Sequence, residues 1–144
     1  MDDIDLGAGV FSQGEGLLLR TIRLLALRNA CFGQQCHFEL ACGWSGEEAY
    51  RTLSVFVEQL RLNGQRRIVL SAPPARTATD DERSILAAFA AAQHDDYREL
   101  DARLADLTQS QPPASLGGAV CLVAQVFAMQ GLLIRGETPE RVAA

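Results

Sequence analysis

The spacing of apolar and polar residues along the chain predicts a series of amphipathic helices. Apolar residues recur every three or four positions in several stretches, as on one face of an α-helix with its period of about 3.6 residues. The helices that this pattern predicts span about residues 17–30, 45–63, 80–93 and 97–107. Because each has one apolar face that needs a partner, the pattern predicts that these helices pack together.

Two four-residue motifs predict where helices begin. Ser45-Gly46-Glu47-Glu48 and Thr79-Asp80-Asp81-Glu82 both fit the capping box. In that motif a Ser or Thr hydroxyl accepts from the backbone N–H three residues further on, and the Glu carboxylate there reaches back. Asn63-Gly64 predicts the end of the first of these two helices, because glycine permits a left-handed cap.

The most apolar stretch of the chain is residues 115–134, which contain no charged residue. A row of small residues follows four-three-four-three spacing there: Gly117, Cys121, Ala124, Ala128 and Gly131. Such a row lets a neighbouring helix approach closely. The stretch is long enough for a membrane span, but a core helix surrounded by five amphipathic elements explains it as well. We expect the core helix.

Two short stretches of the chain do not show a clear helical pattern. Residues 36–42 alternate apolar and polar residues, which is typical of a strand, although their composition also suits the short helix that we favour. Residues 66–71 are apolar, partly β-branched and followed by Pro73-Pro74, so we expect them to be extended. A lone extended segment must pair with residues 36–42, pair with another chain, or pack irregularly, because its backbone groups need partners.

Together these elements predict a mainly α protein, a single-domain bundle of five or six helices around the apolar C-terminal helix. A chain of 144 residues fits one domain and can bury a core without a disulfide or a metal. The acidic, glycine-rich residues 1–16 are expected to form a flexible arm, residues 17–135 the helical domain, and residues 136–144 a frayed tail.

The charge of the chain narrows the classes of function. The formal net charge is −5, and general nucleic-acid binding is not expected, because such proteins are usually basic. The charge is unevenly distributed, with seven arginines and four acidic residues in residues 17–67 and a net charge of −5 in residues 80–106. In the first helix Arg20, Arg23 and Arg28 are expected on a solvated cationic face.

Cysteine and histidine provide the strongest candidates for chemistry. The chain opens on acidic residues instead of the basic start of a signal peptide, so we expect a cytoplasmic protein with reduced thiols. Thiolate and imidazole bind zinc, iron and copper. The candidate ligands are Cys31, Cys36, His37 and Cys42. Their spacing lacks the C-x-x-C pairs of structural zinc sites, so buried core thiols are the preferred interpretation, and no cofactor is expected.

No catalytic residues are predicted. Gly43-Trp44-Ser45-Gly46 resembles a nucleophile elbow, but that motif requires glycine two residues after the serine, where Glu47 stands. The acidic run Asp80-Asp81-Glu82 is explained by capping and by the helix dipole. The sequence therefore does not favour an enzyme.

Several motifs resemble an uncharacterised bacterial family of small helical proteins, a domain of unknown function. The matching stretches lie within residues 17–135 and are Leu17-Leu18-Leu19-Arg20-Thr21-Ile22-Arg23, Arg66-Arg67-Ile68-Val69-Leu70-Ser71-Ala72-Pro73, Thr79-Asp80-Asp81-Glu82 and Leu116-Gly117-Gly118-Ala119. The resemblance implies a compact helical protein without an assigned activity. Similar proteins often have a cysteine-rich turn after the extended segment, and here Pro74-Ala75-Arg76 stands in that place.

The sequence favours a small non-enzymatic interaction or regulatory module. Its expected partner is another protein or a second copy of the chain, which would form a homodimer by pairing residues 66–71. Neither nucleic acid nor a membrane is an expected partner. The alternative is a small metal-binding or thiol-redox protein that uses Cys31, Cys36, His37 and Cys42.

Overall fold

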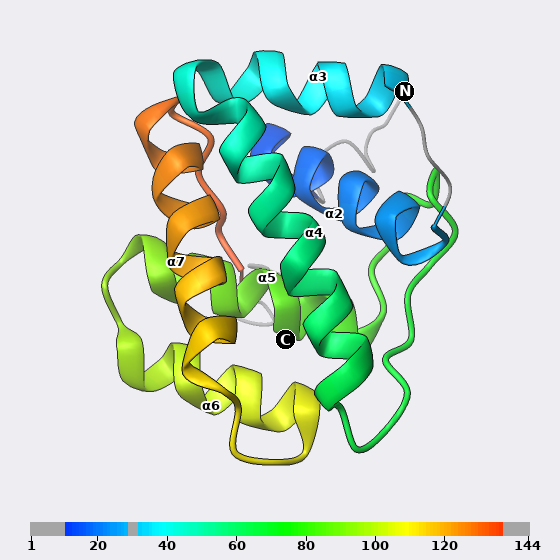
Figure 1. Cartoon of the computed structure of the whole chain (residues 1–144), viewed down its shortest axis with the longest axis vertical. Coiled ribbons are helices and arrows are strands. Elements are labelled where there is room, and N and C mark those ends of the chain that lie inside the picture. The colour runs from blue at the N-terminus through cyan, green and yellow to red at the C-terminus, as the bar shows by residue number, and fades with distance from the viewer. Residues whose placement is uncertain (1–10, 29–31, 137–144) are drawn as a thin grey trace, which may run out of the picture.

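The computed structural model describes residues 11–28 and 32–136 of the chain. These residues contain six α-helices, one 3-10 turn and no strand. The helices are α2 (Gln13–Ala26), α3 (Phe32–Cys42), α4 (Gly46–Asn63), α5 (Asp80–Gln93), α6 (Tyr97–Thr108) and α7 (Ala114–Met129), and the 3-10 turn is η1 (Gly43–Ser45). Figure 1 shows them packed into one bundle, which confirms the predicted mainly α fold. Residues 36–42 are helical, as favoured.

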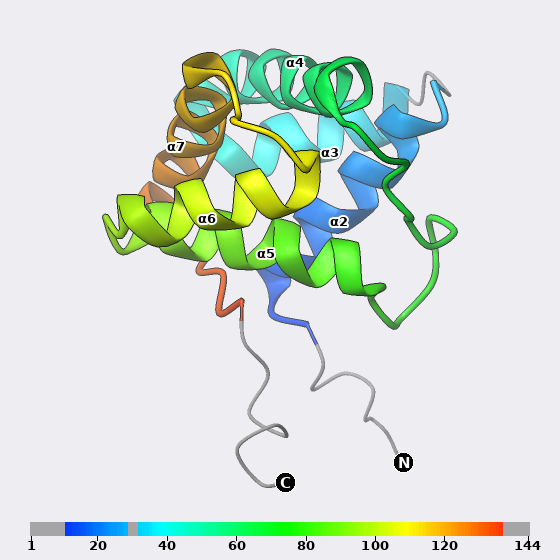
Figure 2. The same cartoon turned by 90° about the horizontal axis from the view of Figure 1, so that it is seen from below.

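Four helices each contribute one phenylalanine to the centre of the core. Phe38 of α3, Phe56 of α4, Phe89 of α5 and Phe127 of α7 are all fully buried. The ring centroids of Phe38 and Phe127 are 5.7 Å apart, and those of Phe56 and Phe89 are 5.4 Å apart. Figure 2 shows α4 on one side of the bundle and the α5–α6 pair on the other. The core lies between them.

The C-terminal helix is packed on one side and open on the other. Helix α7 contacts α4, α5 and α6, and Ala124 is fully buried, whereas Gln125 and Met129 are exposed. The helix ends in a Schellman motif, because Gly131 adopts φ +75° and the Leu132 N–H donates to the Phe127 carbonyl oxygen at 2.9 Å. The helix therefore ends before Gly131, the last of the small residues that were predicted to lie along it. Within residues 11–28 and 32–136, none of the helices is sufficiently long and apolar to cross a membrane.

Helix α2 begins at Gln13 instead of Leu17. Ser12 caps it, since its hydroxyl accepts from the Glu15 N–H at 3.1 Å and the Glu15 carboxylate accepts from the Ser12 N–H at 2.8 Å. The expected flexible arm is therefore wrong for residues 13–16, where this capping box starts a helix. Residues 1–10 of the expected arm and residues 137–144 of the expected tail lie outside the described residues.

Glu15 also fixes the segment that follows α7. Its Oε2 atom accepts from the backbone N–H groups of Arg135 at 2.8 Å and Gly136 at 3.1 Å. The Ser12 hydroxyl donates to the Leu133 carbonyl oxygen at 2.8 Å. In Figure 2 the blue start of α2 and the red segment after α7 lie side by side. Gly136, expected at the start of a frayed tail, is buried there.

The two predicted capping boxes differ in outcome. The box at Thr79 is confirmed, because its hydroxyl accepts from the Glu82 N–H at 3.0 Å and the Glu82 carboxylate accepts from the Thr79 N–H at 3.0 Å. The box at Ser45 is wrong, because η1 runs directly into α4 and holds Ser45 at ψ 17°, outside the extended region of a cap. The expected left-handed cap is also wrong, since Gly64 is extended at φ −75° and ψ 140°.

Alanine at the two cap positions should have unequal effects. Thr79→Ala removes the acceptor for the Glu82 N–H and a hydrogen bond of 2.6 Å to the Val69 carbonyl oxygen, so we expect the free energy of unfolding to fall by about 1–2 kcal/mol. Ser45→Ala should stay within about 0.5 kcal/mol of the unmodified protein. Urea denaturation followed by circular dichroism measures both values. Equal losses would show that Ser45 caps α4 after all.

Residues 64–79 form an irregular segment between α4 and α5. The Val69 N–H donates to Asp81 Oδ2 at 2.7 Å, and the Ser71 N–H donates to Glu82 Oε2 at 2.9 Å. Carboxylates from the first turn of α5 thus accept the backbone hydrogen bonds that the carbonyl groups of a neighbouring strand would accept in a sheet. Of the three alternatives for residues 66–71, irregular packing is the observed one, and pairing with residues 36–42 is excluded because those residues are helical.

Candidate functional site

The residues predicted as metal ligands do not converge. Cys31 lies outside the described residues. Helix α3 carries the other three, of which Cys36 is half-buried, His37 is exposed and Cys42 is buried. Burial raises the pKa of the Cys42 thiol to about 11, so it is protonated and unreactive near neutral pH. In the part of the chain that the structure describes, no group of three or more His, Cys, Asp and Glu side chains could hold a metal.

A cleft lies between α2, the second half of α4 and the start of the irregular segment. Its volume is about 570 Å³, which falls in the range of small-molecule binding sites. Apolar side chains from all three elements form its floor: Ile22, Leu25, Val57, Leu60, Ile68 and Leu70. Several of them are only partly buried. The cleft therefore presents apolar surface that the described residues leave uncovered.

Arginine side chains surround this apolar floor. Arg28, Arg61, Arg66 and Arg67 line the cleft, and among the described lining residues Glu58 is the one acid. Glu58 lies 3.8 Å from Arg28 and also pairs with Arg61. The hydrogen bond from Arg61 lowers the pKa of the Glu58 carboxyl below its ordinary value, so Glu58 is ionised at neutral pH. Its single charge leaves the rim with an excess of positive charge.

The arginines differ in how far their charge is already neutralised. Arg66 forms a two-pronged pair with Asp81, at 2.8 and 3.2 Å. The two arginines beside Glu58 share one carboxylate. Arg67 is exposed, and its guanidinium has no ion-pair or hydrogen-bond partner within residues 11–28 and 32–136. An incoming anion can therefore bind the Arg67 guanidinium without first displacing a carboxylate from it.

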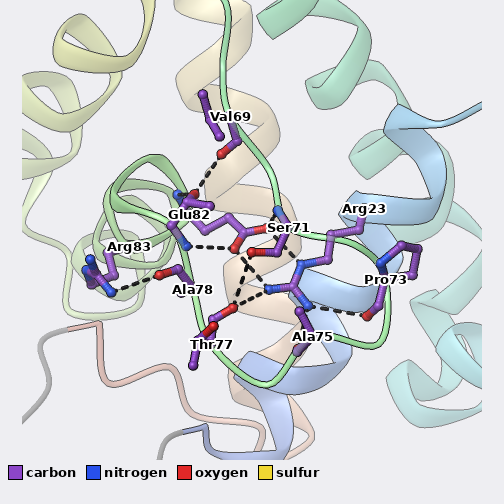
Figure 3. A network of polar contacts seen from close by, with 10 residues as sticks. Arg23, Val69, Ser71, Pro73, Ala75, Thr77, Ala78, Glu82 and Arg83 are labelled. Carbon is purple, nitrogen blue, oxygen red and sulfur yellow. Dashed lines mark hydrogen bonds and ion pairs between the residues drawn. The ribbon is translucent and has the colours of Figure 1, made fainter.

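A buried ion pair holds the irregular segment that forms one wall of the cleft. The Arg23 and Glu82 side chains are 3% and 0% exposed, and they pair through distances of 2.7 and 2.9 Å. In Figure 3 the Arg23 guanidinium lies between α5 and the segment. It also donates to the carbonyl oxygens of Pro73 at 3.3 Å, Ala75 at 2.8 Å and Thr77 at 3.0 Å. All five of its N–H groups are thereby used.

Glu82 completes the network from α5. Its carboxylate accepts from Arg23 and from the backbone N–H groups of Ser71 and Thr79. Burial alone would raise the pKa of Glu82, but these hydrogen bonds and the charge of Arg23 outweigh burial and hold it below its ordinary value. The pair is satisfied within the protein, so it positions the segment and offers no charge to a ligand. Arg23, expected on a solvated face, is buried because it pairs with Glu82.

Comparison with protein-family models, with curated proteins and with solved structures finds no match to this chain. The resemblance to an uncharacterised bacterial family therefore stays a prediction. The excess of arginine in residues 17–67 was the one sequence signal for the cleft. It could not show which arginines line the same cleft. They come from three separate segments of the chain, which only the packing of α2 beside α4 brings together.

Proposed function

We propose that this protein is a small non-enzymatic binding module whose cleft takes an amphipathic anion. We mean an organic molecule with an apolar chain or ring system and a carboxylate or phosphate at one end. The observation that supports the proposal is the combination of an apolar floor of partly buried side chains with a rim of four arginines. The regulatory role expected from the sequence fits a module that responds to such a ligand.

Each part of the cleft has a counterpart in this class of ligand. An apolar body would cover Ile68, Leu70 and their neighbours and gain about 25 cal/mol for each Å² removed from water. An anionic group would accept charge-assisted hydrogen bonds from Arg67, which are roughly twice as strong as neutral ones. A ligand that lacks the charge would not engage the arginines, and a ligand that lacks the apolar body would not cover the floor of the cleft.

The lining is better suited to binding than to catalysis. Its charged groups are guanidinium groups, which are always protonated and do not act as bases, and the Glu58 carboxylate. Glu58 is paired with arginine, and its lowered pKa makes it a weak base. The expected cytoplasmic location and the expected absence of a nucleic-acid partner stay predictions.

Arg67→Glu should weaken the binding of an amphipathic anion by at least about tenfold, because it replaces the available cation with a repelling charge. The probe is anilinonaphthalene sulfonate, whose fluorescence rises in apolar surroundings, and laurate should displace it whereas acetate should not. Arg98→Glu is the matched control, because Arg98 is an exposed arginine of α6 outside the cleft. It should change the affinity by less than about twofold.

Three results would overturn the proposal. The first is the absence of saturable probe binding to the unmodified protein. The second is an equal loss of affinity in Arg67→Glu and Arg98→Glu, which would show that only the overall charge matters. The third is probe binding that laurate does not displace, which would place the probe elsewhere on the surface.

A further inference from the structure

Helix α3 forms an outer edge of the bundle, away from the cleft. Its inner side contacts α2 and α4, where Phe38 and Cys42 are buried. In Figure 1 none of the other described helices lies beyond α3 at this edge. Leu40 on that side is 83% exposed, and Trp44 in the adjoining turn η1 is fully exposed. Large apolar side chains that stand together in water are typical of interaction surfaces.

The outer side of α3 has His37 and Leu40 at its middle and carries no acidic residue, lysine or arginine there. Gly33, His37 and Leu40 follow one another at four-three spacing, which places them along one face of the helix, and Trp44 follows in turn η1 after Gly43, which adopts φ +72°. Glu39 is the only acidic or basic residue of α3 besides His37. Glu39 is half-buried and accepts a hydrogen bond of 3.0 Å from Gln35. We call the row from Gly33 to Trp44 the α3 face.

We propose that the α3 face binds a second copy of the same chain, with the two α3 helices antiparallel about a two-fold axis. His37 and Leu40 lie equally far from the middle of the row, so the axis places turn η1 of one copy, with Trp44, beside the start of the other copy's α3, where Gly33 lies. A Cβ atom at Gly33 would meet no other atom of residues 11–28 and 32–136 within 4 Å, which leaves room for the indole. In the same register Leu40 lies opposite His37.

The charges at the two ends of the α3 face favour this arrangement. Glu47, which pairs with Arg51 at 3.9 Å, and Glu48 are exposed just after Trp44, and in the antiparallel dimer they approach the start of the other copy's α3. The N-terminus of a helix carries a partial positive charge, and the first turn of α3 contains no acidic residue of its own. The acidic end of one copy therefore complements the N-terminal end of the other.

The same charges disfavour a lipid surface as the occupant. Anionic membranes attract clusters of lysine and arginine, and α3 with η1 contains neither. Symmetric dimers are the commonest soluble oligomers, and tryptophan is enriched at the energetic centres of interfaces. Pairing through residues 66–71, by contrast, has fewer backbone groups to offer, because the N–H groups of Val69 and Ser71 already have acceptors.

Trp44 is the only tryptophan of the chain, so its fluorescence reports on the α3 face directly. We expect the mass from light scattering to rise from 15.6 kDa towards twice that value as the concentration increases from the low to the high micromolar range. The Trp44 emission should shift to shorter wavelength over the same range, because the indole leaves water. A constant monomer mass with unshifted emission would overturn the proposal.

Two variants test the register, and a third serves as the control. Leu40→Glu brings like charges close to the axis, and Gly33→Leu fills the space for the indole, so each should raise the dimer dissociation constant by more than about tenfold. Leu62→Glu introduces the same charge at an exposed leucine near the far end of α4 and should leave it unchanged. A dimer that survives both α3 substitutions, or that Leu62→Glu weakens equally, would also overturn the proposal.

Discussion

Arg23→Met is expected to lower the free energy of unfolding by about 3–5 kcal/mol. Methionine keeps an apolar stem but removes all five guanidinium donors. Glu82 is then left as a buried carboxylate without its counter-charge, and the carbonyl oxygens of Pro73, Ala75 and Thr77 lose their donor. An uncompensated buried charge is among the most destabilising changes that a single substitution can make.

The control for Arg23→Met is a half-buried ion pair of the same chemistry. Arg103 pairs with Glu99 on the surface of α6 at 2.6 Å, so Arg103→Met should cost less than about 1 kcal/mol. The double variant Arg23→Met with Glu82→Met should recover part of the loss, because it leaves no unpaired charge. Urea denaturation measures all three. Similar losses in Arg23→Met and Arg103→Met would contradict the central position that we assign to the buried pair.

Gly46→Ala is expected to cost about 3 kcal/mol, although alanine is the better helix former. A Cβ atom at Gly46 would lie 2.2 Å from the Glu39 carbonyl oxygen and 2.8 Å from the carbonyl carbon and the Cα of the same residue. These are backbone atoms that no side-chain rotation can move. The junction between α3 and α4 would therefore have to open, which disturbs the packing that positions α3.

Gly118→Ala, in contrast to Gly46→Ala, should stabilise the protein. Gly118 is an exposed residue within α7, and a Cβ atom there would meet no other described atom within 4 Å. Alanine should therefore raise the free energy of unfolding by about 0.5–1 kcal/mol through its helix propensity. Thermal or urea unfolding compares the two variants directly. A stabilising Gly46→Ala would show that α3 and α4 do not approach each other as closely as described.

The sequence predicted those helices best whose ends have local signals. Helices α5 and α6 were placed almost to the residue, because a capping box or an aspartate precedes them and their apolar positions repeat. The start of α2 was missed, because its capping residues Ser12 and Glu15 lie among glycines that indicated a flexible arm. The Ser45 motif was misleading, because a capping box in sequence cannot show that a 3-10 turn already leads into the helix.

The candidate site depends on contacts between distant parts of the chain, which hydrophobic periodicity cannot predict. Periodicity assigns an arginine beside an apolar stripe to the solvent, so it could not predict that Arg23 is buried opposite Glu82, a residue far along the chain. It also assigns apolar residues to the core, so it could not predict that Leu40 and Trp44 stand in water. The excess of arginine before residue 67 was visible, but the cleft exists only once α2 and α4 have packed.

The link between Glu15 and the segment after α7 means that the order of the helices along the chain could be changed without changing the bundle. Ser12 and Gly136 lie on the same side, joined through Leu133 and Glu15. A short linker between these positions, with new ends in the turn after Thr108, would give a circular permutant that retains the six described helices, α2 to α7. The adjacent ends also allow the whole bundle to be inserted into a surface loop of a host protein, where both connections would leave from one point.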